Sequence, residues 1–149
     1  MSSRLAAIYT ALAAMPVPVG GALASVRNYD ALPASVATAD TPVRLLMPLS
    51  AQPGGGVSVV TFSGAQQADW RIADLLILRP AQAGRLEQAA ALMVEYQVNY
   101  AAAAANTRGL AGAFIQSLTM DAGVFTYPAG GTAQWFGVEV KLTLREVWR

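Results

Sequence analysis

The stretch Trp135-Phe-Gly-Val-Glu-Val-Lys-Leu-Thr-Leu144 decides the fold of this chain. Apolar and polar residues alternate along it, which is the pattern of a β-strand with one face in the core and the other in solvent. The face expected in the core carries Phe136, Val138, Val140, Leu142 and Leu144. The opposite face carries Glu139, Lys141, Thr143 and Arg145. The whole strand is predicted to run from Ala133 to Trp148, well beyond the usual length of roughly five or six residues.

The regions before this strand predict two helices and further strands. A short amphipathic helix is expected to begin near Leu5 and to stop at Pro16, and a long helix is expected at Gly84–Ala105. Extended segments are expected at Ala22–Tyr29, Val43–Leu49, Val57–Phe62, Trp70–Arg79 and Ala113–Tyr127. The sequence therefore predicts one α+β domain spanning residues 1–149, in which two helices pack on a largely antiparallel sheet in the order helix, four strands, helix, two strands.

Three of these strands carry finer predictions. Val43–Leu49 and Val57–Phe62 are expected to pair as a hairpin, because the glycine-rich segment Ser50–Gly56 lies between them. Trp70–Arg79 is expected to be a central strand covered on both faces, because Leu75-Leu-Ile-Leu78 shows no alternation.

Composition argues for a protein that covers its surface with partners. Only 13% of the residues are charged, against about 25% in an average domain, so much of the surface must be uncharged. Ten Lys and Arg residues balance nine Asp and Glu residues and are scattered along the chain, which argues against a specific nucleic-acid partner. No apolar run reaches the roughly 18 residues that cross a bilayer, so no membrane partner is predicted.

The residue inventory leaves few catalytic options. The chain has no Cys and no His, which excludes Cys-ligated metal sites, Cys nucleophiles, His bases and the Ser-His-Asp triad. Asp69 and Asp74 lie five residues apart on one strand and are expected on opposite faces, as solvated or ion-paired strand ends. Glu87 and Glu95 are expected on the surface of the long helix. The sequence predicts no enzyme activity, no cofactor and no metal.

Aromatic and Arg residues gather in the closing hairpin, and these residue types are enriched where proteins bind one another. The candidate interface residues there are Tyr127, Trp135, Arg145, Trp148 and Arg149. The alternative interpretation is that half of the aromatic residues complete the core. The excess length of the last strand is the second reason to expect contact with a neighbouring subunit.

A second candidate interface is the tip formed by Gln52, Pro53, Gly54, Gly55 and Gly56. Three glycines leave its backbone free, so it is expected to become ordered only on a partner. The alternative is a simple connector between two strands. The tip lacks the Lys-Ser/Thr ending of a phosphate-binding loop.

The chain resembles the tail-terminator proteins of tailed bacteriophages in two regions. The first is Trp70-Arg-Ile-Ala-Asp-Leu-Leu76, before the long helix. The second is Tyr127-Pro-Ala-Gly-Gly131 followed by Trp135–Leu144. The resemblance extends over most of the chain. It implies a structural virion protein of the neck, without catalytic residues, that forms a hexameric ring at the head-proximal end of the tail. Such a ring ends polymerisation of the tail tube, contacts the tail tube protein and the head-completion protein, and assembles in the host cytoplasm.

Two other functions remain open from the sequence. Another head-tail connector or neck protein of the virion would share this composition and habit of assembly. A small secreted binding protein is the second alternative, because Ala22-Leu-Ala24 has the form of a signal-peptidase site.

Overall fold

The computed structural model describes residues 4–48, 57–62, 65–82, 85–107, 109–127 and 131–148. The helices are α1 (Leu5–Ala14) and α2 (Leu86–Asn106), with short 3-10 turns η1 (Tyr29–Ala31) and η2 (Thr38–Asp40). The strands are β1 (Pro18–Val19), β2 (Ala22–Leu23), β3 (Ser25–Arg27), β4 (Val43–Pro48), β5 (Val57–Phe62), β6 (Ala65–Pro80), β7 (Ala113–Thr126) and β8 (Gln134–Trp148).

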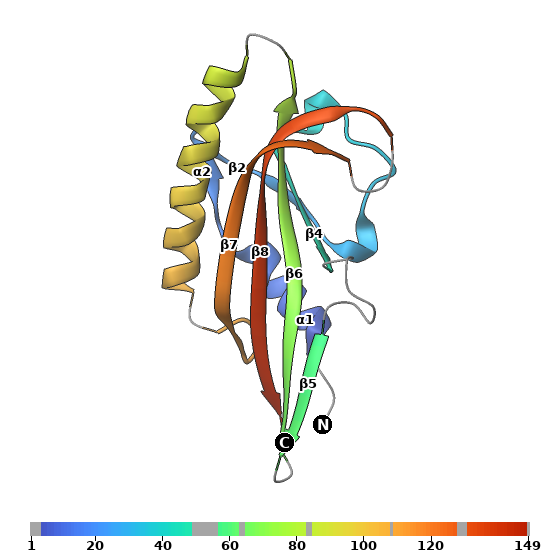
Figure 1. Cartoon of the computed structure of the whole chain (residues 1–149), viewed down its shortest axis with the longest axis vertical. Helices are drawn as coiled ribbons and strands as arrows, with labels where there is room; N and C mark the ends of the chain where they lie inside the picture. Colours follow the sequence, from blue (N-terminus) through green and yellow to red (C-terminus); the bar gives the residue numbers. More distant parts are fainter. Residues whose placement is uncertain are drawn as a thin grey trace.

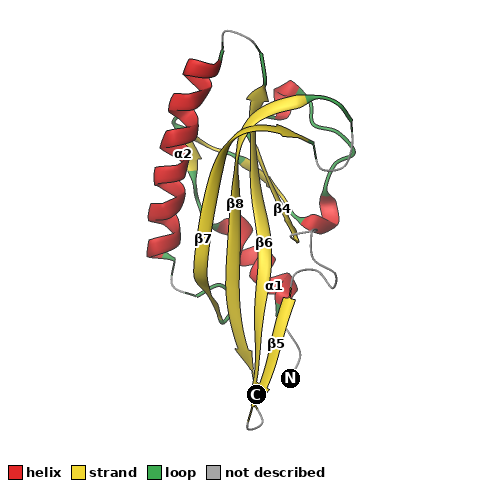
Figure 2. Cartoon of the chain, in the orientation of Figure 1, coloured by secondary structure: helices red, strands yellow, loops and turns green. Residues whose placement is uncertain are grey.

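Among the described residues, six strands form one sheet with the order β3-β4-β6-β8-β7, and β5 pairs with β6 on the side where β4 also pairs (Figure 1). All pairs are antiparallel except β3 with β4. Both helices contribute to the core on one face of this sheet (Figure 2). The predicted class, an α+β fold with two helices on a largely antiparallel sheet, is confirmed.

Strand β8 confirms the alternation that opened the sequence analysis. Its residues from Phe136 to Leu144 on the apolar face are at most 5% exposed, whereas Lys141 on the other face is exposed. Strand β6 is central, between β4 and β8, and its buried residues face both ways, as predicted for Trp70–Arg79. It is longer than predicted, because it begins already at Ala65 and its first six residues pair with β5.

The predicted hairpin between Val43–Leu49 and Val57–Phe62 is wrong. Both β4 and β5 pair with β6, at Ile72–Ile77 and at Ala65–Trp70 respectively, so they follow one another along the same side of that strand. The hairpin is instead made by β5 and β6, which are adjacent in sequence. The apolar pattern predicted each strand but did not indicate with which other strand it would pair.

The buried residues form two clusters on opposite faces of the sheet. The helix-side core joins Ile8, Leu12, Met93 and Tyr96 to the inward residues of β6 and β8. The opposite core contains Val43, Leu45, Leu75, Ile77, Tyr127 and Trp135, and Leu32 and Val36 pack against it. Among the described residues, the second cluster is confined to one end of the sheet, and Lys141 on the same face lies exposed farther along β8.

Candidate assembly surface

Two of the predicted interface residues belong to the core. Tyr127 and Trp135 are each 6% exposed and pack in the opposite core, and the Tyr127 hydroxyl donates a hydrogen bond to the Pro33 carbonyl oxygen. The prediction that these two rings form a docking surface is therefore corrected. The sequence identified aromatic residues at the end of the sheet, but it could not show that residues 29–40 fold over them.

Arg145 is half-buried on the face of the sheet away from the helices, and it forms an ion pair across strands. Its Nε and Nη2 donate to the two carboxylate oxygens of Asp69 at 2.9 and 3.1 Å. These hydrogen bonds lower the pKa of Asp69 below its usual value. Asp69 thus has the ion-paired role predicted for it, and Arg145 is already engaged within the chain.

The structure does not test the remaining predicted interface residues as contact sites. Trp148 is the last residue of β8 and pairs with Gln66 of β6. Arg149 and the tip Gln52–Gly56 lie outside the described residues.

Asp74 departs from its prediction, because it is fully buried in the middle of β6. Arg44 of β4, only 2% exposed, donates to it through Nη2 at 2.6 Å, and the Tyr100 hydroxyl of α2 donates to the same oxygen at 2.7 Å. Burial raises the pKa of Tyr100 well above its usual value, and the negative charge of Asp74 adds to this shift. One carboxylate thus joins two strands and the long helix.

The Arg44 guanidinium also connects the sheet to α1. Its Nη1 donates to the Met15 carbonyl at 2.9 Å and its Nη2 to the Leu12 carbonyl at 3.3 Å, so its positive charge lies at the C-terminal end of the helix, where it is favourable. No spacing in the sequence links Arg44 with Asp74, because the contact depends on the pairing of β4 with β6. The network holds the fold together and has no solvent-exposed member.

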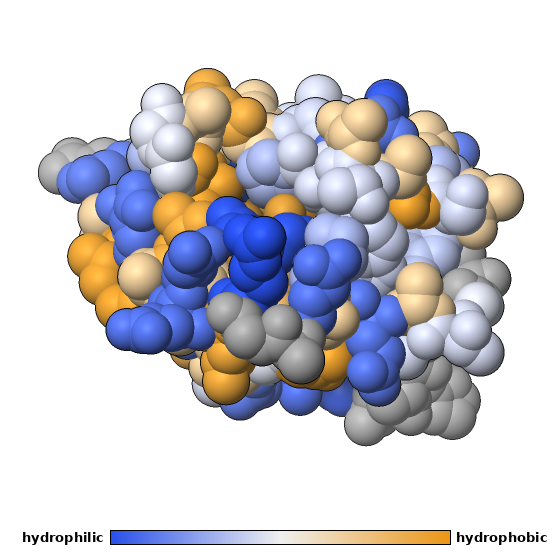
Figure 3. All heavy atoms as spheres, turned by 90° about the horizontal axis from the view of Figure 1, so that it is seen from above, coloured by the Kyte–Doolittle hydropathy of each residue, from blue (hydrophilic) through white to orange (hydrophobic). Residues whose placement is uncertain are grey.

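The outer face of α2 is apolar and exposed. Val94 and Val98 are 60% and 63% exposed, and Ala91, Ala102 and Ala105 are exposed beside them. Glu87 and Glu95 lie on the surface, as predicted. In the view from above, hydrophobic atoms reach the surface on the side where α2 stands (Figure 3). An apolar face of this kind is characteristic of a surface that partners cover.

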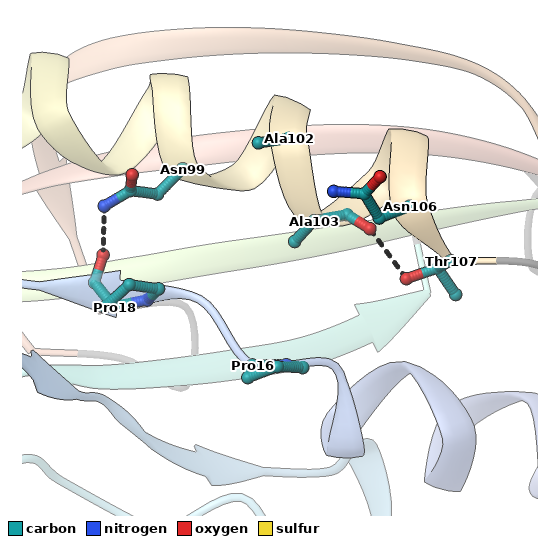
Figure 4. A pocket seen from close by; sticks show the side chains of 7 residues that line it. All are labelled: Pro16, Pro18, Asn99, Ala102, Ala103, Asn106 and Thr107. Atoms are coloured by element: carbon teal, nitrogen blue, oxygen red, sulfur yellow. Dashed lines mark hydrogen bonds between the residues drawn. The ribbon is translucent and has the colours of Figure 1, made fainter.

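Two hollows flank the C-terminal half of α2. One is a cleft of about 460 Å³ between α2 and the chain that leads into β1, lined by Pro16, Asn99 and Ala102 among others (Figure 4). Asn99 crosses this cleft and donates to the Pro18 carbonyl at 2.9 Å. The other is a groove between α2 and β7, lined by Ala101, Ala104, Ala105 and Ile115–Leu118.

Strand β7 forms one edge of the sheet. Within the described residues, thirteen of its fourteen positions pair with β8 and with no other strand. Ala113 exchanges two backbone hydrogen bonds with Leu110, so the edge that is open to another strand begins beyond Ala113. Phe114 and Val124 on this strand are about half exposed. The groove beside α2 follows this edge, which places an apolar wall next to unpaired backbone.

Other kinds of site find little support among the residues described. These residues contain no group of three acidic, His or Cys side chains that would hold a metal ion. None of the described helices is both long and apolar enough to cross a bilayer. No protein-family model matches the chain, and no curated protein matches it.

Proposed function

We propose that the protein is a structural component of a phage tail that forms a ring and ends the tail tube at its head-proximal end. The resemblance set out above implies a ring of six copies. The observation that carries the proposal is the open edge of β7 beside the exposed apolar face of α2. A long edge strand and an apolar helix face are costly on a protein that stays alone, because both favour association.

The shape of the chain supports repeated contacts with like subunits. Strands β6 and β8 contain 16 and 15 residues and extend well past the helices (Figure 1). Surfaces on two opposite sides of one subunit give a heterologous contact, and heterologous contacts close into rings when the rotation between copies allows it. The tail tube protein and the head-completion protein are the partners proposed for the two ends of the ring.

The test is to locate the protein in a particle. Antibody-labelled or tagged protein should appear as one ring at the head-proximal end of the tail, and native mass spectrometry of complexes extracted from particles should give a ring mass. A dimer as the largest assembly, or label elsewhere in the particle, would contradict the proposal.

A second experiment, on particles that lack the protein, separates a terminator from the other neck proteins. Without a terminator, tail tubes are expected to grow beyond their normal length, whereas without a connector they should keep normal length but stay unjoined. Tube length in particles lacking this protein therefore distinguishes the two functions.

A further inference from the structure

The edge of β7 at Asp121–Gly123, together with the flank of α2 beside it, forms a receiving site for a short β-strand. We propose that this site takes β3, Ser25–Arg27, of a second copy of the chain. Strands β3 and β7 are the two ends of the sheet order, so the same contact can repeat from one copy to the next. The proposal rests on the proposed ring and names the contact between its subunits.

The backbone groups of the two edges are in phase for this pairing. The Ser25 amide donates to the Pro42 carbonyl oxygen, just before β4. In a parallel pair this directs the backbone groups of Ser25 and Arg27 toward β4 and those of Val26 outward. The same alternation, followed through β4, β6 and β8, leaves Ala122 of β7 directed outward. Val26 and Ala122 of two copies can therefore exchange both backbone hydrogen bonds in an antiparallel pair.

This pairing also keeps the helices of both copies on one side. Side chains directly opposite each other on neighbouring strands lie on the same face of a sheet. Val26 packs against the helix-side core, and Ala122 is on the same face, because its partner Val138 belongs to that core. Pairing Val26 with Ala122 therefore continues the sheet from one copy into the next with all helices in one layer.

Opposite charges meet in the joint. With Val26 opposite Ala122, Arg27 lies opposite Asp121 on the face away from the helices. The Asp121 side chain is 66% exposed, and its ion pair with Lys141 of the same chain is 3.9 Å long. Arg27 is exposed and forms no ion pair with the residues that the structure describes. Each charge is thus available to a second copy.

Other antiparallel registers lose this charged pair. Sliding β3 by two residues along β7 keeps the phase of the backbone groups but places Arg27 opposite Thr119 or Gly123. Sliding it by one residue puts the backbone groups out of phase and turns each side chain to the other face. Since Asp121 is the only acidic residue of β7, one register combines the backbone hydrogen bonds with the opposite charges.

This part of the β7 edge is accessible within the described part of the chain. Asp121 and Ala122 are exposed, and Val124 is 49% exposed. The turn in which Leu110 and Ala113 exchange backbone hydrogen bonds occupies the other end of β7. The first and last residues of β3 are exposed as well. Both strands can therefore be reached without displacing a backbone contact of the chain.

An apolar stripe on α2 supplies side-chain contacts. Its members recur at spacings of four, three and four residues, so they share one flank of the helix: Val94, Val98, Ala101 and Ala105. Ala101 and Ala105 line the groove beside β7, which places the stripe along this edge (Figure 1). Val94 lies about 10 Å from Ala101 along the helix, or about three residues along β7, which brings it near the level of Asp121.

The incoming copy carries an apolar side chain that can cover this stripe. Leu23 of β2 is 63% exposed and lies two residues before β3. Strand β2 pairs with β1, which packs beside α2 of its own chain, so this hairpin is on the helix side of the sheet. In the joint, Leu23 therefore enters on the side where Val94 and Val98 of the other copy are 60% and 63% exposed.

The chain has no Cys, so engineered disulfides test the contact directly. Ser25→Cys with Gly123→Cys, which are opposite each other in this register, should give a ladder of covalent multimers on a denaturing gel. The oxidant is glutathione disulfide, applied to concentrated purified protein and to particles. Within one chain β4, β6 and β8 separate the two positions, so the disulfide requires a second copy. A Cβ atom at Gly123 meets open space.

The matched control is Ser25→Cys with Thr119→Cys. Thr119 is on the same face of β7 as Gly123 but about 13 Å farther along the strand, so this pair should stay monomeric. A ladder from the Thr119 pair as strong as that from the Gly123 pair would contradict the register. A covalent dimer from Gly123→Cys alone, as abundant as the ladder, would show that β7 pairs with its own copy instead.

Exchanging the charges tests the partner without cysteine. Arg27→Glu should abolish self-association measured by analytical ultracentrifugation, because it faces Asp121 of the next copy. Adding Asp121→Arg to the same chain should restore association, which a partner other than a second copy would not do. Arg85→Glu changes the net charge equally at an exposed position of α2 and should associate as the unmodified chain does. Loss of association in the double variant, with an unchanged thermal melt, would reject the charged pair.

The results also separate this contact from the proposed function. Monomer alone from the Ser25 and Gly123 pair, with a ring still seen in particles, rejects the contact and leaves the proposed function standing. A ladder without any ring on tails rejects the proposed function and leaves the contact.

Discussion

At the scale of single residues, the most consequential contact is the buried pair of Arg44 and Asp74. Removing two charges from water carries a large desolvation penalty, and the pair is tolerated because each remaining polar group has a partner. The carboxylate accepts from Arg44 and Tyr100, and the guanidinium also donates to the end of α1. The pair therefore fixes how α1 and α2 sit on the sheet.

Asp74→Ala should destabilise the protein by about 3–5 kcal/mol, because it leaves the Arg44 charge buried without its partner. The double variant Arg44→Met with Asp74→Leu should recover most of this loss, since it removes both charges together. Urea unfolding followed by circular dichroism measures both changes. If the double variant were less stable than Asp74→Ala, the penalty would come from lost packing and not from the unpaired charge.

Gly137 has a role that the alternating pattern hides. A Cβ atom at this position would overlap the carbonyl oxygen of Leu76 on the neighbouring strand. Gly137→Ala should therefore cost about 1–3 kcal/mol through overpacking. The control is Gly123→Ala on β7, which pairs with Gly137 but has open space at the same position. Similar urea midpoints for the two variants would disprove the close approach.

Asp69 makes stability depend on acid pH. Its pKa is lowered in the folded state by Arg145, so its contribution is present above the unfolded value of about 4 and is lost as the pH falls through the lower folded value. The stability difference between the unmodified protein and Asp69→Asn should therefore shrink below about pH 4. Unfolding free energies measured from neutral to acid pH test this, and a constant difference would contradict it.

The residue scale also shows what the sequence could not predict. Asp69 could be assigned to an ion pair because exposed strand ends commonly carry one. Asp74 could not be placed, because its environment depends on β4 arriving beside β6 and on Tyr100 reaching down from α2. Tyr127 and Trp135 were ambiguous for the same reason, since the segment that covers them lies about a hundred residues earlier in the chain.

At the scale of elements, β8 tests how far the alternation determines folding. Val140→Asp should prevent folding, because it places a second carboxylate in the helix-side core, beside its cross-strand neighbour Asp74. Lys141→Ala on the opposite face should fold, since Lys141 is exposed and its ion pairs with Asp121 and Glu139 are weak. Circular dichroism of both variants is the measurement. Equal damage would place the strand in the wrong register.

Elements with a strong period were predicted well, and their pairing was not. The long helix, the first helix and the last two strands lie within a few residues of their expected bounds, because each has an apolar face set by local spacing. Strands β4 and β5 were correctly predicted as strands but were wrongly predicted to pair with each other. Pairing depends on contacts between distant segments, and here β6 offers one continuous side to both.

At the scale of the whole molecule, the two cores share their strands. In β4, Val43 and Leu45 face the opposite core, while the alternate residues Arg44 and Leu46 face the helices. Leu75 and Leu76 divide in the same way on β6. Because both cores depend on the backbone of these strands, loss of packing in one core should disturb the strands and with them the other core.

The molecule should therefore unfold in a single transition, whichever core is weakened. Met93→Ala in the helix-side core should cost about 2–5 kcal/mol, and Trp135→Ala in the opposite core about 3–5 kcal/mol. In each variant, thermal melts followed by far-ultraviolet and near-ultraviolet circular dichroism should coincide, because secondary structure and aromatic packing are lost together. Separation of the two curves in Trp135→Ala would show that residues 29–40 and the end of the sheet form a unit that melts before the helix-side core.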